Sequence, residues 1–185
     1  MLPDFELTVN AELTTAFRKL GISDFSAACV YVHQLPYGRN ARRGDFLSVL
    51  QEGKGTCSSK HGLLAQLAVL HGQDEIHLMV GIFLMSAKTH PQVSPVLEAH
   101  GLAMIPEAHA YFRYNGKRYD FTAAGKDIAA IEPFIVREQR CEPNQLNDWK
   151  PMIHRHYIDS WLKRQNHPFS PEALWEIREK CIAIF

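Results

Sequence analysis

Residues 108–122 read AHAYFRYNGKRYDFT, with aromatic and polar side chains alternating on both sides of Asn115-Gly116. This alternation predicts two β-strands, and Asn-Gly is the preferred pair for a two-residue type I′ turn. The sequence therefore predicts an antiparallel hairpin closed by Asn115 and Gly116.

A two-residue turn also fixes which side chains of the hairpin share a face. His109 and Asp120 then become diagonal neighbours on one face, with Cβ atoms about 7–8 Å apart or somewhat less, within reach of an imidazole and a carboxylate. A three-residue loop would place them on opposite faces. Counted outward from the turn, the apolar face pairs Tyr114–Lys117, Phe112–Tyr119 and Ala110–Phe121, and the other face pairs Arg113–Arg118, Tyr111–Asp120 and His109–Thr122.

A second informative segment lies upstream, where residues 53–61 read GKGTCSSKH. Cys57 follows two glycines and opens an apolar-periodic run that extends to His71 and stops at Gly72. The pattern predicts a loop that delivers a thiol to the first turn of a helix. Free backbone N–H groups and the positive end of the helix dipole favour a thiolate there, and such placement can lower a cysteine pKa into the range of about 3.5–7.5.

Cys57, His109 and Asp120 together have the residue types of a nucleophile, a general base and an orienting carboxylate. The thiolate would attack a carbonyl, the imidazole would move protons, and the carboxylate would fix the imidazole tautomer. Singly, each residue has a more ordinary interpretation: a small buried thiol, a hydrogen-bonded strand histidine and a solvated strand aspartate. The order of the three residues and the hairpin register favour the triad.

This combination resembles the transglutaminase-like branch of the papain-like cysteine-proteinase fold, as a small bacterial-type, single-domain member. The resemblance rests on the Gly-x-Cys at a helix start, the His-Ala-aromatic strand and the Asp-aromatic-Thr on the next strand, and it covers residues ~45–125 in the family's helix-then-sheet order. It implies that Cys57, His109 and Asp120 are catalytic. The chain departs from the animal enzymes at Tyr111, where those enzymes have tryptophan.

Several other polar residues near Cys57 invite functional interpretations. An oxyanion site needs a side-chain donor besides the Cys57 N–H, and Gln51 and Asn40 are the candidates. His61 lies one helical turn after Cys57 and could tune the thiol, although a packed helix residue is the more common case. The cluster Arg39, Arg42 and Arg43 could bind a substrate carboxylate, although a solvated loop is more usual.

The ten histidines raise the question of a metal site. His154 and His156 are two residues apart on a predicted helix, so they point in different directions. A Cys57–His61 pair would need two further ligands. We therefore predict no metal and no cofactor.

Composition limits the class of protein. The 185 residues are 46% hydrophobic and 22% charged, which suits a single domain over residues 1–185. Twenty basic and twenty acidic residues cancel, so no charge imbalance favours nucleic acid or an anionic membrane. No secretory signal and no membrane-length apolar run is present, which predicts a cytoplasmic protein. The cysteines are widely spaced, which indicates neither a disulfide framework nor a zinc knuckle; they are Cys29, Cys57, Cys141 and Cys181.

The remaining elements complete an α+β prediction, in which the nucleophile helix packs on the polar-centred face of an antiparallel sheet with flanking helices. Residues 86–107 are predicted to be a long loop. The other predicted elements are helices over 11–20 (N-cap Asn10), 24–34 (N-cap Ser23), about 45–51, about 144–165 and 171–184 (N-cap Ser170), a central strand over 76–85 and a strand over 134–140.

The sequence thus predicts thiol-dependent acyl transfer at an amide or peptide-like bond, by hydrolysis or by transfer to an amine. The substrate would be a peptide, a protein or a small amide. A catalytically idle scaffold that binds a peptide in the same cleft is the alternative, and a His/Cys metal protein is a third class. Substrate identity and oligomeric state are not predicted.

Overall fold

The predicted hairpin forms one edge of an antiparallel sheet. The structure is a computed structural model that describes residues 1–125 and 127–185. In that part of the chain the sheet order is β3-β2-β1-β4, which confirms the α+β class and the central position of the strand after the Cys57 helix. The strands are β1 (His77–Ser86), β2 (Met104–Tyr114), β3 (Lys117–Tyr119) and β4 (Ile135–Arg140).

The turn has the geometry that its sequence predicts. Asn115 and Gly116 have φ values of 47° and 76°, both in the left-handed region that a type I′ turn requires. The register pairs Tyr114 with Lys117 and extends to a Phe112–Tyr119 pair, as expected. Because β3 ends there, β3 does not cover the outer edge of β2 from Tyr111 back towards Met104.

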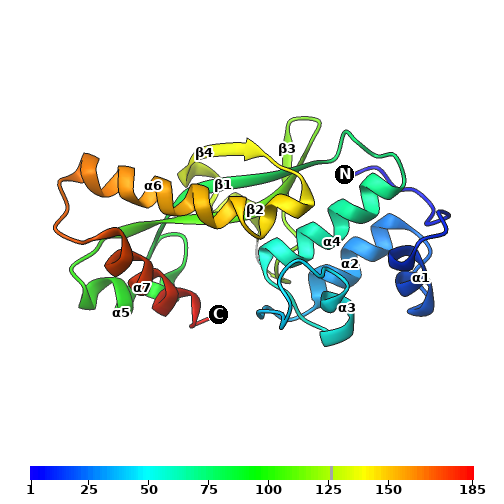
Figure 1. Ribbon diagram of the computed structural model, residues 1–185, viewed down its shortest axis with the longest axis horizontal. Helices are drawn as coiled ribbons and strands as arrows, with labels where there is room; N and C mark the ends of the chain where they lie inside the picture. The colour runs from blue at the N-terminus through cyan, green and yellow to red at the C-terminus, as the bar shows by residue number, and fades with distance from the viewer. Residues whose placement is uncertain (126) are drawn as a thin grey trace.

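The helices divide between the two ends of the sheet. In Figure 1, α1 to α4 gather at one end, α5 and α7 lie at the other, and α6 runs along the sheet between them. The helices are α1 (Glu12–Lys19), α2 (Phe25–Gln34), α3 (Ser48–Glu52), α4 (Cys57–Leu70), α5 (Ser94–Ala99), α6 (Trp149–Gln165) and α7 (Pro171–Ile182), with 3-10 turns η1 (Pro91–Val93), η2 (Ile128–Ala130), η3 (Glu132–Phe134) and η4 (Pro143–Leu146).

Two of the three predicted helix caps are wrong by one residue. The N-cap of α1 is Ala11, without a side-chain cap, instead of Asn10. The N-cap of α2 is Asp24 instead of Ser23, and its carboxylate accepts the Ala27 N–H at 2.7 Å. Ser170 caps α7 as predicted. Local sequence therefore located the starts of these three helices to within a residue, whereas α3 begins at Ser48 and α6 at Trp149, later than the predicted starts at about 45 and 144.

The prediction of a long loop over residues 86–107 is wrong. This segment contains η1 and α5, and β2 already begins at Met104. Pro91 and Pro95 lie in the first turns of η1 and α5, where a missing N–H costs little. Pro106 lies within β2 where β3 does not cover its outer edge, which is a position that strand prolines tolerate.

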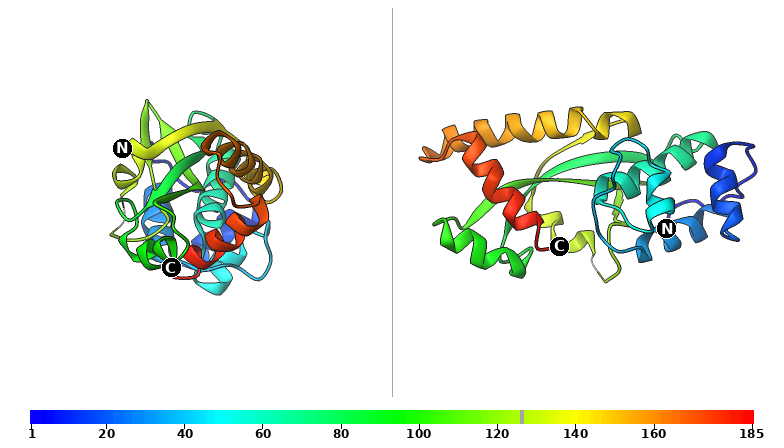
Figure 2. Two further views of the ribbon diagram at one scale, coloured as in Figure 1. Left: turned by 90° about the vertical axis from the view of Figure 1, so that its left-hand side faces the viewer. Right: turned by 60° about the horizontal axis from the view of Figure 1, so that its bottom comes forward.

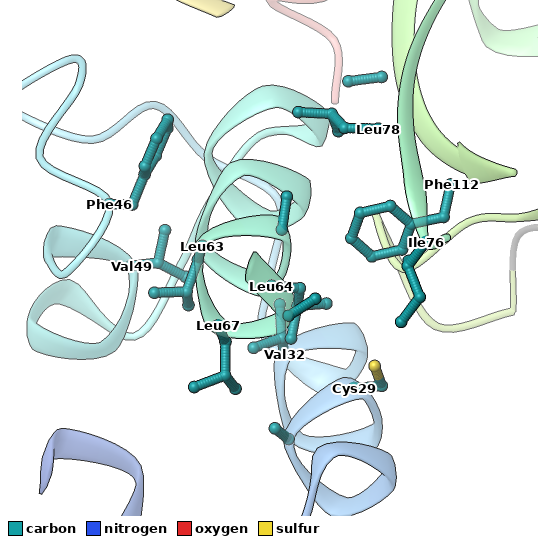
Figure 3. Close-up of a cluster of buried hydrophobic side chains, with 14 of the residues drawn as sticks. Cys29, Val32, Phe46, Val49, Leu63, Leu64, Leu67, Ile76, Leu78 and Phe112 are labelled. Carbon is teal, nitrogen blue, oxygen red and sulfur yellow. The ribbon is translucent and has the colours of Figure 1, made fainter. Parts of the chain in front are cut away.

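Helix α4 packs on the apolar face of the hairpin, and this corrects the predicted packing on the polar-centred face. Figure 3 shows Leu64 of α4 and Phe112 of β2 in one buried cluster, which α2 and α3 complete. Ala108 and Ala110, on the same face as Phe112, belong to the same cluster. Burial of apolar surface decides this choice, because the opposite face of β2 carries Glu107 and His109.

A second cluster fills the other end of the molecule, where β1 and β2 meet α5, α6 and α7. Figure 2 shows α6 running along the top of this end, with α7 crossing below it. Gly81 of β1 is needed for close packing there, because a Cβ atom would lie 2.7 Å from Tyr111 Oη. Within residues 1–125 and 127–185, no helix combines the length and apolar character required to cross a bilayer.

Candidate active site

Cys57 is the first residue of α4, as the sequence predicts. Thr56 is the N-cap, its side chain accepts the Ser59 N–H at 3.3 Å, and the Ser59 hydroxyl accepts the Thr56 N–H at 2.8 Å. This reciprocal cap fixes the first turn of α4. Gly55 is required just before it, because a Cβ atom there would lie 2.8 Å from Lys60 Cγ.

His109 and Asp120 lie within hydrogen-bond distance of each other, as the hairpin register predicts. His109 Nε2 donates to Asp120 Oδ2 at 2.8 Å. Asp120 Oδ1 accepts the backbone N–H of Thr122 at 2.9 Å and its hydroxyl at 2.5 Å. The carboxylate is therefore held from both sides, and it fixes the His109 ring so that its other nitrogen, Nδ1, faces away from Asp120.

The Cys57 thiol lies beside this histidine at the uncovered edge of β2. The Cys57 sulfur and the His109 ring are hydrogen-bonded, and the Ala110 backbone N–H donates to the same sulfur. The edge is open at Ala110 because β3 pairs with β2 only from Phe112 onward. The short third strand thus leaves a place where the start of α4 reaches the histidine.

Lys150, in the first turn of α6, is a second cation beside the thiol, and no local pattern in the sequence predicts it. Its ammonium donates to Cys57 Sγ at 3.4 Å and to Ser58 Oγ at 2.7 Å. The side chain is buried. A lysine in the first turn of a helix is disfavoured by the helix dipole, so the nearby anion, and not local helix chemistry, accounts for its position.

These neighbours change the acidity of the thiol and the imidazole in opposite directions. Burial by itself would raise the pKa of Cys57, but the charge of Lys150, followed by that of His109, lowers it to about 5. Burial would likewise lower the pKa of His109, but the charges of Asp120 and then Cys57 raise it to about 10. Near neutral pH the pair therefore exists as thiolate and imidazolium.

His61 belongs to the support of the site and is not a second base. Its Nδ1–H donates to the Cys57 carbonyl at 2.9 Å, and its Nε2 accepts the Phe121 N–H at 2.9 Å. Burial lowers its pKa to about 4, so the ring is neutral. His61 thereby links the first turn of α4 to the segment that carries Asp120.

Buried Lys60 makes a similar link next to it. Its ammonium donates to the Leu35 carbonyl at 2.5 Å and to the Thr122 carbonyl at 2.6 Å. Burial lowers the pKa of Lys60 to about 8. Two successive residues of α4, Lys60 and His61, thus hold the two residues that follow Asp120.

A buried ion pair supports the far side of the site. Glu107 of β2 receives two hydrogen bonds from Arg178 of α7, at 2.6 and 2.7 Å. Burial would raise the pKa of Glu107, but Arg178 lowers it to about 2. Next to this pair, burial lowers the pKa of His154, whose Nε2–H donates to the Pro106 carbonyl at 2.9 Å.

Two cavities include Cys57 in their linings. The first, of about 150 Å³, is lined by five cationic side chains against two carboxylates, and we call it the arginine cavity; its charged lining is Arg39, Arg42, Arg43, Lys150, Arg178, Glu107 and Glu179. The second, of about 420 Å³, contains His109 and Asp120, and we call it the apolar cavity; its apolar lining includes Phe83, Met85, Ile131, Ile182 and Phe185.

The two predicted oxyanion donors have different locations. Asn40 lines the arginine cavity, but its Nδ2 donates to the carbonyls of Lys54 and Ser48, at 3.0 and 3.4 Å. It therefore holds the loop before Cys57. Gln51 is exposed on α3 and lines neither cavity, so the structure does not bring it to the site.

Metal-ligating side chains do not gather elsewhere in the part of the chain that the structure describes. Among residues 1–125 and 127–185, no three His, Cys, Asp or Glu side chains are placed to hold one ion. The four cysteines are all buried and unpaired as disulfides.

Comparison with known proteins adds no family assignment. No protein-family model, no curated protein and no solved structure matches this chain.

Proposed function

We propose that this protein is a thiol enzyme that transfers an acyl group from an amide or peptide-like carbonyl through a thioester on Cys57. The observation that carries this proposal is the sequence of contacts from the Cys57 sulfur to the His109 ring and on to Asp120 at 2.8 Å. The transglutaminase-like resemblance agrees with this arrangement and remains part of the proposal.

The first half of the reaction forms the thioester. The Cys57 thiolate attacks the carbonyl carbon, and the electron pair of the C=O bond moves to oxygen. The oxyanion collapses, the C–N bond breaks, and the His109 imidazolium gives its proton to the leaving amine. The Cys57 backbone N–H has no partner within α4, because it belongs to the first turn, and Lys150 adds positive charge at the same helix start.

The second half releases the acyl group. Neutral His109 now removes a proton from water or from an amine, which attacks the thioester carbonyl and expels the Cys57 thiolate. Asp120 keeps the ring in place during both halves. Attack by water gives hydrolysis, and attack by an amine gives transamidation.

The alternative function is a peptide-binding scaffold that uses the same cleft without turnover. Buried thiols are common structural residues. A protein can also keep these three residues and bind a peptide in a geometry that does not allow turnover. The observation against it is the placement of two cations on one sulfur, since a structural thiol needs neither.

Alkylation separates these two functions. An activated Cys57 should react with iodoacetamide well below pH 8, as followed by peptide mapping. Cys141 and Cys181 are internal controls, because burial raises the pKa of both thiols, that of Cys141 to about 12. Labelling of Cys57 no faster than of these two cysteines would refute the activated thiol.

A substrate screen then tests the reaction itself. Pools of acyl-donor peptides are incubated with the protein, with and without a primary amine, and the products are identified by mass spectrometry. A transient mass increase on Cys57 identifies the thioester. Products that carry the amine indicate transamidation, and free acids indicate hydrolysis. Rapid alkylation without any acyl product would support the scaffold.

A further inference from the structure

The positively charged side chains that line the arginine cavity outnumber the carboxylates that line it. Arg39 pairs with Glu179 at 2.6 Å and Arg42 pairs with Asp45 at 2.8 Å, while Arg178 pairs with Glu107. No carboxylate pairs with Arg43 in the part of the chain that the structure describes.

Lys150 loses its negatively charged partner during the proposed reaction. In the resting site its ammonium faces the Cys57 thiolate. Formation of a thioester removes that negative charge, and it leaves a buried ammonium in contact with a neutral sulfur. A buried charge without a partner is costly, so an anion delivered by the substrate would stabilise the acylated site.

The position of His109 decides which cavity receives which half of the substrate. The leaving amine must lie next to the proton donor, and His109 lines the apolar cavity and not the arginine cavity. The acyl half must then extend from Cys57 in the other direction, into the arginine cavity. The two cavities share Cys57, so a single amide can reach both.

From the cations of this cavity and the absence of His109 from its lining, we propose that the arginine cavity binds a carboxylate on the acyl half of the substrate. The substrate class is an amide whose acyl group is acidic and whose amine half is apolar enough for the cavity of about 420 Å³. This inference rests on the proposed thiol chemistry, and it adds the charge and the orientation of the substrate.

Two alkylating agents of nearly equal size test the charge preference at Cys57 itself. Iodoacetate carries a carboxylate, and iodoacetamide is neutral. The double variant Arg39→Gln/Arg43→Gln should slow alkylation of Cys57 by iodoacetate about tenfold, the usual effect of losing charge-assisted contacts, and leave the iodoacetamide rate unchanged. Added salt should reduce the iodoacetate rate in the wild-type protein more than in the variant.

The matched control is Arg137→Gln on β4, an exposed arginine that lines neither cavity. Its iodoacetate and iodoacetamide rates should equal those of the wild type. Equal iodoacetate rates in all three proteins would overturn the carboxylate site. Slow iodoacetamide labelling of the wild type would instead count against the activated thiol.

A binding measurement keeps the test independent of thiol reactivity. Glutarate, a small dicarboxylate, should bind to Cys57→Ala by calorimetry, and binding should weaken about tenfold when Arg39→Gln/Arg43→Gln is added. Inorganic phosphate serves as the comparison anion and should bind more weakly. Absence of glutarate binding at millimolar concentration, or binding of phosphate alone, would refute a carboxylate site.

Discussion

Two regions of the molecule each place a cation against Cys57, and they are built differently. His109 and its partner Asp120 are eleven residues apart on one hairpin, so the turn sets their relation. Lys150 comes from α6, 93 residues after Cys57, and its position depends on how α6 packs along the sheet. We call these the hairpin side and the α6 side. The geometry of the hairpin side is set by residues close together in the sequence, whereas the α6 side forms only when distant segments of the chain pack together.

The difference has a functional consequence. On the hairpin side, the charge is part of a proton-transfer system, because His109 can gain and lose a proton while Asp120 holds it. On the α6 side, Lys150 places positive charge beside the sulfur without taking part in that proton transfer, and a buried Glu107–Arg178 pair joins β2 to α7. The two regions therefore make separable contributions, to proton transfer and to thiolate stability, and mutations should distinguish them.

The largest effect is expected at the thiol that both regions share. Cys57→Ala should abolish turnover of any substrate found in the screen, because no other residue at the site can form the thioester. Thermal melting should stay close to wild type, since the change removes one sulfur atom beside a cavity. Thioester formation is checked by intact-protein mass spectrometry. Retained turnover would end the thiol mechanism.

On the hairpin side, loss of the orienting carboxylate should reduce turnover strongly without abolishing it. Asp120→Ala should lower turnover by up to about 10⁴-fold, because the imidazole loses its fixed tautomer. His109→Ala should be more severe, since it removes the proton carrier itself. Steady-state kinetics of both variants provide the comparison. Wild-type activity of folded His109→Ala would show that His109 is not the proton carrier of the reaction.

On the α6 side, the first test concerns stability. Glu107→Gln should destabilise the fold by about 1.5–3 kcal/mol, because Arg178 loses two charge-assisted hydrogen bonds and keeps only its bond to Glu179 at 2.6 Å. The pair stabilises the folded state above the ordinary Glu107 pKa of 4.5, and this contribution is lost as the pH falls towards the folded value of about 2. Chemical denaturation at neutral pH measures the difference.

The control for this pair is the exposed Lys163–Asp159 pair on α6, at 2.7 Å. Asp159→Asn should change the free energy of unfolding by no more than about 1 kcal/mol, because solvent screens surface pairs. A loss of similar size in both variants would show that burial does not distinguish the two pairs.

The smallest effect, and the most specific to the α6 side, is on the acidity of the thiol. Lys150→Met should raise the Cys57 pKa from about 5 by about 1–3 units, because removal of a nearby cation disfavours the thiolate. The pH profile of iodoacetamide labelling measures this shift. Lys163→Met, an exposed lysine on the same helix, is the control and should leave the profile unchanged. An identical profile in Lys150→Met would assign the low pKa to the hairpin side alone.

The sequence by itself determined the hairpin side. Asn115-Gly116 specified a two-residue turn, and the turn fixed the register that brings His109 to Asp120. The glycines before Cys57 and the apolar run after it specified a helix start at the thiol. These features follow from backbone preferences within a few residues, and such preferences act before any distant contact forms. Whether the three residues are catalytic stays a prediction.

Only the tertiary structure decided the α6 side, the face of the hairpin that α4 covers, and the two cavities. Lys150, Glu107 and Arg178 have no local pattern that sets them apart from surface charges. Gln51 has a plausible spacing from Cys57 in the sequence for an oxyanion donor, yet its side chain on α3 is exposed to solvent. The α4 face was decided by where apolar area could be buried, and Lys150 reaches Cys57 because α6 packs on the sheet. The physical reason is that hydrogen-bonded turns and caps are short-range, whereas burial and the pairing of buried charges depend on segments far apart in the chain.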